Sequence, residues 1–274
     1  MLNSILARAQ VDPPADARRL SIAGRACGWV AGDVVPLLLP FAEEIAVAPD
    51  AVHMLPGTGQ PARAAVDGLL ARVAQALFQA GRLNGWRNEL LDVEADDGTV
   101  LGVIERAAVR PLGIATHAVH LNAWTPDGRA WIARRAATKT TDPGKWDTLV
   151  GGLISAAETP EIALARESWE EAGLMPEHLA GGQRRGRFRV RRTLPEGYQI
   201  ENVTVVDVVL GPGVTPANQD GEVDLIRTVR CDEALAMIGR DEFTLEAALS
   251  LLLGCAARHV PLGVDPEALS AVAA

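Results

Sequence analysis

The sequence predicts a two-domain α+β protein, in which a small α+β domain precedes a larger one. Its 274 residues exceed one ordinary small domain and fall short of three. Short elements and Pro/Gly-rich breaks occupy the first part of the chain, whereas strand pairs and longer helices follow from Pro111 onward. We therefore expect an N-terminal α+β domain over 1–110, a second domain over 111–260 and a C-terminal tail over 261–274.

The composition excludes several classes of protein. Hydrophobic residues make up 48% of the chain and charged residues 22%, as in an average globular protein. The net charge of −9 argues against binding of nucleic acid through bulk charge. The three cysteines lack disulfide or zinc spacing, and the apolar segment 245–257 is shorter than the roughly 20 residues of a membrane span. We therefore expect a cytoplasmic protein that binds neither nucleic acid nor membrane.

The elements expected in the N-terminal domain are short. A helix over 63–79 is the clearest of them, because its apolar residues recur at three- and four-residue intervals. A Pro/Gly-rich break over 56–61 precedes it, and the turn Asp96-Asp97-Gly98 separates two strands. The other expected elements are a strand over 26–30, a short helix over 32–41 and strands over 86–93 and 99–104.

The second domain is expected to open with two strands around the turn Pro126-Asp127-Gly128. A polar loop over 136–146 then leads to a helix with clear ends. Thr159 is a good N-cap, Pro160 fits the first turn, and Gly173 can end the helix in a left-handed conformation. The other expected elements are strands over 117–124, 130–134, 148–150, 185–192 and 203–210 and helices over 232–238 and 244–257.

Three glutamates crowd one face of the helix that starts at Pro160. Glu167, Glu170 and Glu171 are spaced at i, i+3 and i+4, and their carboxylates repel one another near the helix C-terminus, where the macrodipole also disfavours negative charge. A divalent cation would relieve this conflict, because hard oxygen ligands suit Mg²⁺ and Mn²⁺. A solvated acidic helix face explains the same residues. The glutamates alone do not decide between the two interpretations.

The spacing around this helix is more specific. The segment 152–174 follows the pattern G-x5-E-x7-R-E-U-x-E-E-x-G-U, where U is a bulky apolar residue. This pattern is similar to the Nudix box, and the sequence resembles the Nudix hydrolases. Ser168 departs from it at the first apolar position, where a buried hydroxyl could bond to the preceding helical turn. The matching residues are Gly152, Glu158, Arg166, Glu167, Glu170, Glu171, Gly173 and Leu174.

The resemblance extends beyond the box. The run WIARRAATKTTDPGKWD, over 131–147, resembles the Nudix branch that carries a thiamine pyrophosphokinase-associated N-terminal domain. The segment around Gly28-Trp29-Val30 resembles that N-terminal domain. The resemblance implies a C-terminal α/β/α sandwich with a mixed sheet, preceded by a small α+β domain.

The resemblance also implies a metal-dependent hydrolase, which cleaves a diphosphate linked to an organic group by attack of water on phosphorus. Glu167, Glu170 and Glu171 are then the expected ligands of Mg²⁺ or Mn²⁺. The backbone carbonyl of Gly152 is a further candidate ligand. The cation would neutralise phosphate oxygens and lower the pKa of a bound water.

Other residues receive roles from the same resemblance. Arg166 would orient the carboxylates by bidentate pairing, and Glu158 would brace the junction of loop and helix. Within the box, Glu170 is the candidate general base. Outside it, Glu222 lies in a loop before a strand, where many Nudix enzymes place an accessory acid; an ordinary turn glutamate is the alternative.

Basic residues near the box are candidates for holding phosphate. Lys139 and Lys145 flank the loop before the box, although solvated loop lysines explain them equally well. Arg134 is a candidate too, but Arg134 and Arg135 end a strand, so at most one of them is expected to face the cleft.

A run of arginines, RRGRFRVRR over 184–192, is unusual in an acidic protein. As a strand it would place Phe188 and Val190 on one face and alternate arginines on the other. Arg187 is therefore a candidate for binding substrate phosphate; the alternative is a contact with acidic surface on a partner subunit in a homodimer. The alternating residues are Arg185, Arg187, Arg189 and Arg191.

Three functions stay open. The family branch points to hydrolysis of thiamine diphosphate, or a damaged analogue, to the monophosphate and phosphate. The organic group could instead be a nucleoside, as in a nucleotide sugar or a dinucleotide. A non-catalytic Nudix-fold sensor that binds a metabolite is the third, and the complete set of box carboxylates disfavours it.

Overall fold

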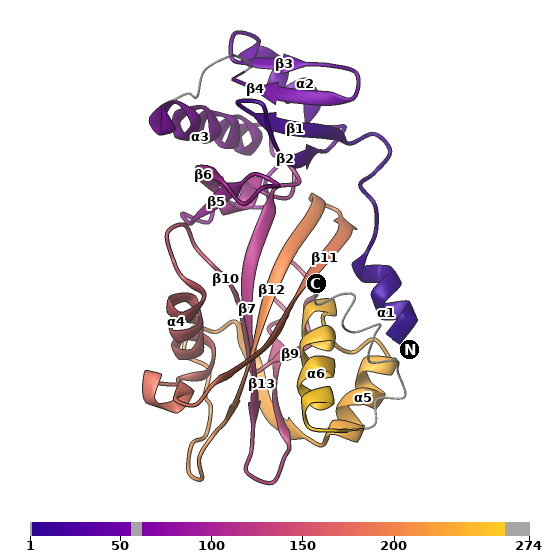
Figure 1. The fold of residues 1–274 in the computed structure, drawn as a ribbon, viewed down its shortest axis with the longest axis vertical. Helices are drawn as coiled ribbons and strands as arrows, with labels where there is room; N and C mark the ends of the chain where they lie inside the picture. Colours follow the sequence, from indigo (N-terminus) through magenta and orange to yellow (C-terminus); the bar gives the residue numbers. More distant parts are fainter. Residues whose placement is uncertain (1, 56–61, 261–274) are drawn as a thin grey trace.

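The computed structural model describes residues 2–55 and 62–260. The expected tail over 261–274 and the Pro/Gly-rich break over 56–61 lie outside the described residues. Two units follow one another along the long axis of the molecule, each around its own sheet (Figure 1). No described helix reaches the length and apolar character that crossing a membrane demands.

The N-terminal unit combines a four-stranded sheet with a helix and a hairpin, as an α+β domain should. The sheet order is β2-β1-β4-β3, and β1 pairs with β4 in parallel. Helix α3 has the expected bounds and packs against β6 through the apolar positions that repeat along it. The elements are β1 (Arg18–Ile22), β2 (Arg25–Val30), α2 (Val35–Leu38), η1 (Leu39–Phe41), β3 (Ile45–Val47), β4 (Ala51–Met54), α3 (Arg63–Gln79), β5 (Leu90–Glu94), β6 (Val100–Glu105) and η2 (Arg106–Ala108).

The C-terminal unit is built on a seven-stranded mixed sheet. The order along its main path is β11-β12-β7-β8-β13, with β10 added to β7 and β9 added to β8. Strands β12 and β7 run parallel, and the other pairings are antiparallel. The elements are β7 (Ala115–Trp124), β8 (Ala130–Arg135), β9 (Trp146–Thr148), β10 (Val150–Leu153), α4 (Pro160–Ala172), η3 (Pro176–Leu179), β11 (Gln183–Leu194), β12 (Gly197–Val209), β13 (Val223–Val229), α5 (Cys231–Gly239) and α6 (Leu245–Ala257).

Helices cover both faces of this sheet. Alternate residues of β7 point to opposite faces, as a strand requires: Ala118 joins the core that includes α6, and Val119 joins the core that includes α4. Helix α6 is buried almost throughout, which explains its nearly continuous apolar sequence. The expected α/β/α sandwich with a mixed sheet is confirmed.

The first helix of the chain, α1 (Leu2–Ala9), lies on the C-terminal unit, beside β11 and α6 (Figure 1). Its buried residues Ile5 and Ala9 belong to the same core as α6. The chain that follows is fixed to the sheet, because the Val11 N–H donates to the Arg191 carbonyl at 3.0 Å and the Tyr198 hydroxyl donates to the Val11 carbonyl at 2.7 Å. The chain therefore starts on the C-terminal unit and crosses to the N-terminal one.

The two units also meet at the loop between β10 and α4. The Ala156 N–H donates to the Leu90 carbonyl at 2.8 Å, and the Ala157 N–H donates to the Asp92 carboxylate at 3.2 Å. Strand β5, which carries Leu90 and Asp92, thus holds the segment that leads into the glutamate-bearing helix. The strand expected over 86–93 starts only at Leu90, and residues 86–89 are irregular backbone at this junction.

Candidate active site

Helix α4 begins and ends as the sequence predicts. The Thr159 hydroxyl accepts from the Ile162 N–H, Pro160 occupies the first turn, and Gly173 takes a left-handed conformation with φ of 62°. Ser168 is fully buried, but its hydroxyl has no hydrogen-bond partner among the described residues. The expected bond from this hydroxyl to the preceding turn is therefore wrong: the small side chain fits the space without a partner.

The absence of a side chain at Gly152 leaves the space that the Glu167 carboxylate occupies. A Cβ on Gly152 would lie 2.0 Å from the Glu167 carboxyl carbon and 2.1 Å from its Oε1, so the glutamate packs directly over the glycine. This close approach is possible only without a side chain at position 152. Strand β10 and helix α4 are thereby brought together at the box, and 13% of the Glu167 side chain is exposed.

Arg166 connects the members of the box. Its guanidinium donates to both carboxylate oxygens of Glu158, each at 2.9 Å, and to Glu167 at 2.7 Å and Glu170 at 3.2 Å. Glu158 in turn accepts from the Ser155 N–H at 3.0 Å. The bidentate pair and the braced loop are the arrangement that the sequence predicted for these two residues.

Glu171 is the most deeply buried of the three glutamates. It is 6% exposed and accepts from the Gly151 N–H at 2.9 Å. Burial raises the pKa of Glu171 to about 8, against the lowering effect of that hydrogen bond. Burial also raises the pKa of Glu167, whereas Glu170 keeps 41% of its side chain exposed. Two carboxylates therefore lie in surroundings that disfavour their negative charge.

This donor set fits a divalent cation in its chemistry. Hard carboxylate oxygens suit Mg²⁺ or Mn²⁺, and a cation would compensate the burial of Glu167 and Glu171. Within residues 2–55 and 62–260 no three His, Cys, Asp or Glu side chains converge as in a preformed metal site. The carboxylates would have to turn toward one another to share an ion, and Arg166, which now neutralises two of them, lies where it could orient them.

A cleft of about 620 Å³ opens beside the box. Gly151 and Gly152 line it, so Glu171 and Glu167 lie directly behind its wall. Further lining residues come from both units, among them Arg106 of the N-terminal one and Thr116 of β7. A cleft of this size suits a small-molecule ligand.

Lys139 and Glu222 both line this cleft and form an ion pair with each other. Desolvation lowers the pKa of Lys139, against the raising effect of the Glu171 charge. The structure brings these two sequence-predicted residues together with the box.

The other candidate phosphate-binding residues lie outside the cleft wall. The Arg134 guanidinium donates to the Gly144 carbonyl at 3.3 Å, whereas its neighbour Arg135 lines the cleft and donates to Asp147 at 3.1 Å. Lys145 pairs with Asp241 at 3.1 Å, on another part of the surface. The expectation that at most one arginine of the pair faces the cleft holds, and it is Arg135.

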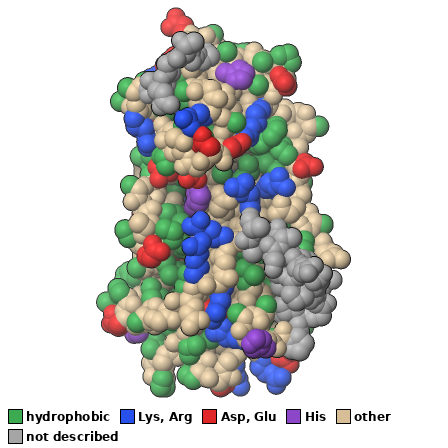
Figure 2. Space-filling model, in the orientation of Figure 1, with side chains coloured by type: hydrophobic (Ala, Val, Ile, Leu, Met, Phe, Trp, Pro, Cys, Tyr) green, Lys and Arg blue, Asp and Glu red, His purple; other side chains and the backbone are tan. Residues whose placement is uncertain are grey.

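The arginine run forms β11, with Phe188 and Val190 buried as expected. Arg187 does not line the cleft and donates to Thr204 at 3.3 Å. The alternation breaks at Arg185, because a β-bulge between residues 184 and 186 turns its side chain to the buried Asp207, at 2.9 Å. In the view of Figure 2, Lys and Arg side chains lie along the middle of the molecule, over the strands of the large sheet.

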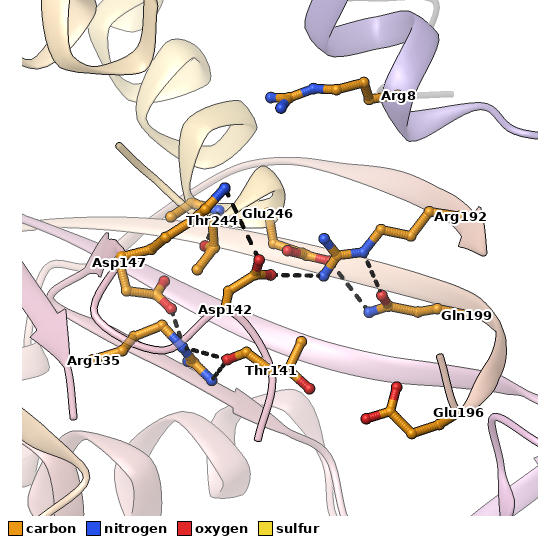
Figure 3. Close-up of polar contacts among 12 residues, drawn as sticks. Arg8, Arg135, Thr141, Asp142, Asp147, Arg192, Glu196, Gln199, Thr244 and Glu246 are labelled. Carbon is orange, nitrogen blue, oxygen red and sulfur yellow. Dashed lines mark hydrogen bonds and ion pairs between the residues drawn. The ribbon is translucent and has the colours of Figure 1, made fainter. Parts of the chain in front are cut away.

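The wall of the cleft also carries buried charged side chains that the sequence did not single out. Arg192 contacts Asp142 at 3.1 Å, Gln199 at 2.7 Å and Glu246 at 3.3 Å (Figure 3). Burial raises the pKa of Glu246, against the lowering effect of Arg192. Glu201, which is 9% exposed, adds a second buried carboxylate. Alternation along β12 could have placed Gln199 and Glu201 on one face, but nothing in the sequence indicated that α6 would cover them.

Sequence models of two known families match this chain. The sequence model of the NUDIX domain matches residues 115–248, and that of a domain of unknown function, DUF4743, matches residues 6–116. The chain is a Nudix-domain protein. The resemblance of its N-terminal half to the domain found in one Nudix branch is also confirmed, since the second family covers that half.

Two relatives from Arabidopsis thaliana match across both domains. "Nudix hydrolase 24, chloroplastic" is 30% identical over 69% of this chain and 53% of its own length, and "Nudix hydrolase 20, chloroplastic" is 29% identical over 67% and 50%. The chain thus spans about half the length of these relatives. A crystal structure of DR0079 from Deinococcus radiodurans is 23% identical, with a TM-score of 0.49 over 61% of this chain and 98% of its own.

Proposed function

We propose that this Nudix-domain protein is a divalent-metal-dependent hydrolase of an organic diphosphate. One observation carries the proposal: Glu167 and Glu171, two of the box glutamates, are buried directly behind the wall of a cleft large enough for such a substrate. Burying carboxylates without a use for them costs stability. Glu167, Glu170, Glu171 and the carbonyl of Gly152 are the groups that would hold Mg²⁺ or Mn²⁺.

Different residues of the box and of the cleft wall have different roles in the proposed reaction. When bound, a divalent cation supplies positive charge to the phosphate oxygens and acidifies water. Arg166 orients the carboxylates and offsets their repulsion, and Glu158 keeps Arg166 in place. Lys139 contributes a positive charge in the cleft wall. The proton of the attacking water passes to a carboxylate, for which Glu170 on α4 and Glu222 in the cleft wall are the candidates.

Thiamine diphosphate or a damaged analogue is the substrate we propose. The support lies in the wall of the cleft, where the buried carboxylates of Glu201 and Glu246 suit an organic group that carries positive charge. The thiazolium ring carries that charge. The organic group of a nucleotide sugar carries no positive charge, so the nucleoside alternative lacks this complement.

The test is release of phosphate from a panel of diphosphates, with Mg²⁺ and with Mn²⁺, in which thiamine diphosphate is compared with ADP-ribose. We expect metal-dependent turnover of thiamine diphosphate, or of an analogue with an altered ring, to the monophosphate. Glu171→Gln should lower kcat by about a hundredfold or more, as loss of a positioned charged group does. Glu170→Gln and Glu222→Gln identify the base. A general base must be unprotonated to act, so only loss of the base removes the fall of kcat at low pH from the pH profile.

The outcomes separate the alternatives. Faster turnover of ADP-ribose would favour the nucleoside hydrolase. A wild-type protein inert toward every diphosphate, with either metal, would overturn the hydrolase. Tight binding of a diphosphate without any turnover would point to the metabolite sensor. The expected cytoplasmic location and the possible homodimer stay predictions.

A further inference from the structure

The N-terminal domain takes part in the cleft. Arg87, Arg106 and Arg110 all line it. All three come from the short stretch between α3 and β7. The Nudix box is acidic, so these guanidinium groups bring positive charge from a separate domain to the place where a diphosphate would lie.

One buried carboxylate fixes the backbone of this stretch. Glu105, 3% exposed at the end of β6, accepts from the Arg87 N–H at 2.7 Å and from the Ala107 N–H at 3.4 Å. It therefore ties the segment that carries Arg87 to the first turn of η2, which carries Arg106. The two arginines are presented from a rigid support and not from a loose loop.

Arg106 is coupled to the box itself. Its Nη1 donates to Glu89 at 2.6 Å, and Glu89 accepts from the Ser155 hydroxyl at 2.8 Å. Ser155 is the residue whose N–H bonds to Glu158. Hydrogen bonds through Glu89 and Ser155 therefore connect Arg106 to the box loop.

The arginines of the cleft differ in how many hydrogen bonds their guanidinium groups already make. Arg135 donates to Asp147 and to the Thr141 carbonyl, and Arg110 donates to the Thr141 hydroxyl at 2.8 Å. Arg106 uses only Nη1 for hydrogen bonds among the described residues, and the Arg87 side chain makes no hydrogen bond or ion pair there. A guanidinium has five N–H donors in a planar fork that matches phosphate oxygens.

We propose that Arg106 of the N-terminal domain, supported by Arg87, binds the phosphate groups of the substrate in the cleft beside the Nudix box. This proposal rests on the proposed hydrolase function and deepens it. The N-terminal domain then adds guanidinium groups to a site whose expected metal ligands come from the Nudix box. The N-terminal domain is a part of the active site, and its loss would remove phosphate binding as well as the support of the box loop.

The test compares steady-state kinetics of Arg106→Ala, Arg106→Lys and wild type on the best diphosphate of the panel. An arginine–phosphate contact is a charge-assisted hydrogen bond, so Arg106→Ala should raise KM by about tenfold or more. Arg106→Lys should recover part of that loss, because it keeps the charge and loses the fork. Arg87→Ala should raise KM to a smaller extent.

Thermal unfolding and one further variant separate substrate binding from a structural role. If Arg106→Ala unfolds at the temperature of wild type, its higher KM reports lost phosphate binding and not a disturbed fold. Arg72→Ala removes an arginine on α3 that pairs with Glu44 outside the cleft, and it should behave as wild type. The proposal is overturned if Arg106→Ala leaves KM unchanged, or if Arg72→Ala raises KM as much as Arg106→Ala does.

Failure of the hydrolase function can be told apart from failure of this proposal. If the wild type hydrolyses no diphosphate, the function fails, and binding of inorganic pyrophosphate with Mg²⁺ is measured by calorimetry. Weaker binding by Arg106→Ala than by Arg72→Ala would still support the phosphate site. Equal binding by both variants, or no binding by the wild type, would overturn it.

Discussion

Substitution of Gly152 by alanine tests how the box is assembled. The new Cβ would lie 2.0 Å from the carboxyl carbon of Glu167, so that carboxylate would have to move by about 1.4 Å to reach an ordinary contact distance. A displacement of about 1 Å at a catalytic group can cost about a hundredfold in rate. We expect kcat to fall by that order. The strain falls on the end of a side chain, so stability should drop by only about 1–3 kcal/mol.

The assay combines Mg²⁺-dependent turnover of the best diphosphate with thermal unfolding. Gly211→Ala is the matched control, because a Cβ there meets no atom within 4 Å and the residue lacks a positive φ. The control should keep both the activity and the melting temperature of wild type. A Gly152→Ala protein that folds and hydrolyses its substrate at the wild-type rate would refute the claim that this glycine positions Glu167.

Three further predictions concern stability. Ser168→Ala should raise the melting temperature, because it removes a buried hydroxyl without a partner and gains about 1 kcal/mol; a lower melting temperature would contradict this. Tyr198→Phe should cost about 1 kcal/mol in denaturant unfolding through loss of the bond to the Val11 carbonyl, and no loss would mean that this bond is not needed to hold the N-terminal segment. The hydrogen bond from Arg166 lowers the pKa of Glu158 from its ordinary value of 4.5. The pair therefore stabilises the folded protein fully above pH 4.5. This stabilisation is lost as the pH falls through the lower pKa that Glu158 has in the folded protein. Unfolding of Glu158→Gln followed against pH should lack that part of the acid dependence.

Local sequence signals predicted the box helix and its surroundings well. Thr159 and Gly173 mark the ends of α4 through bonds made within a few residues, and the positions of Arg166 and Glu158 follow from the spacing of one motif. Helix α3 has its expected bounds because its apolar repeat faces a single core. In each case the forces that decide the structure act over a short length of chain.

Contacts between distant segments could not be predicted in the same way. Helix α1 is too short to show a period, and it is held by a core formed with α6 near the other end of the chain. Arg106 and Glu246 reach the cleft only because the two domains and α6 pack around it. At Arg185 one extra residue in β11 overturned a correct alternation, and a bulge leaves no mark in the sequence.

Binding of Mn²⁺ by the box tests the central claim most directly. Loss of the free Mn²⁺ signal in electron paramagnetic resonance is measured at about pH 8.5, since a ligating carboxylate must be ionised. The wild type should bind Mn²⁺ saturably, Glu171→Gln should bind it at least about tenfold more weakly, and Glu177→Gln, beyond the box helix, should match the wild type. Equal affinity of Glu171→Gln and wild type, or no binding by the wild type, would contradict the assignment of these glutamates as metal ligands.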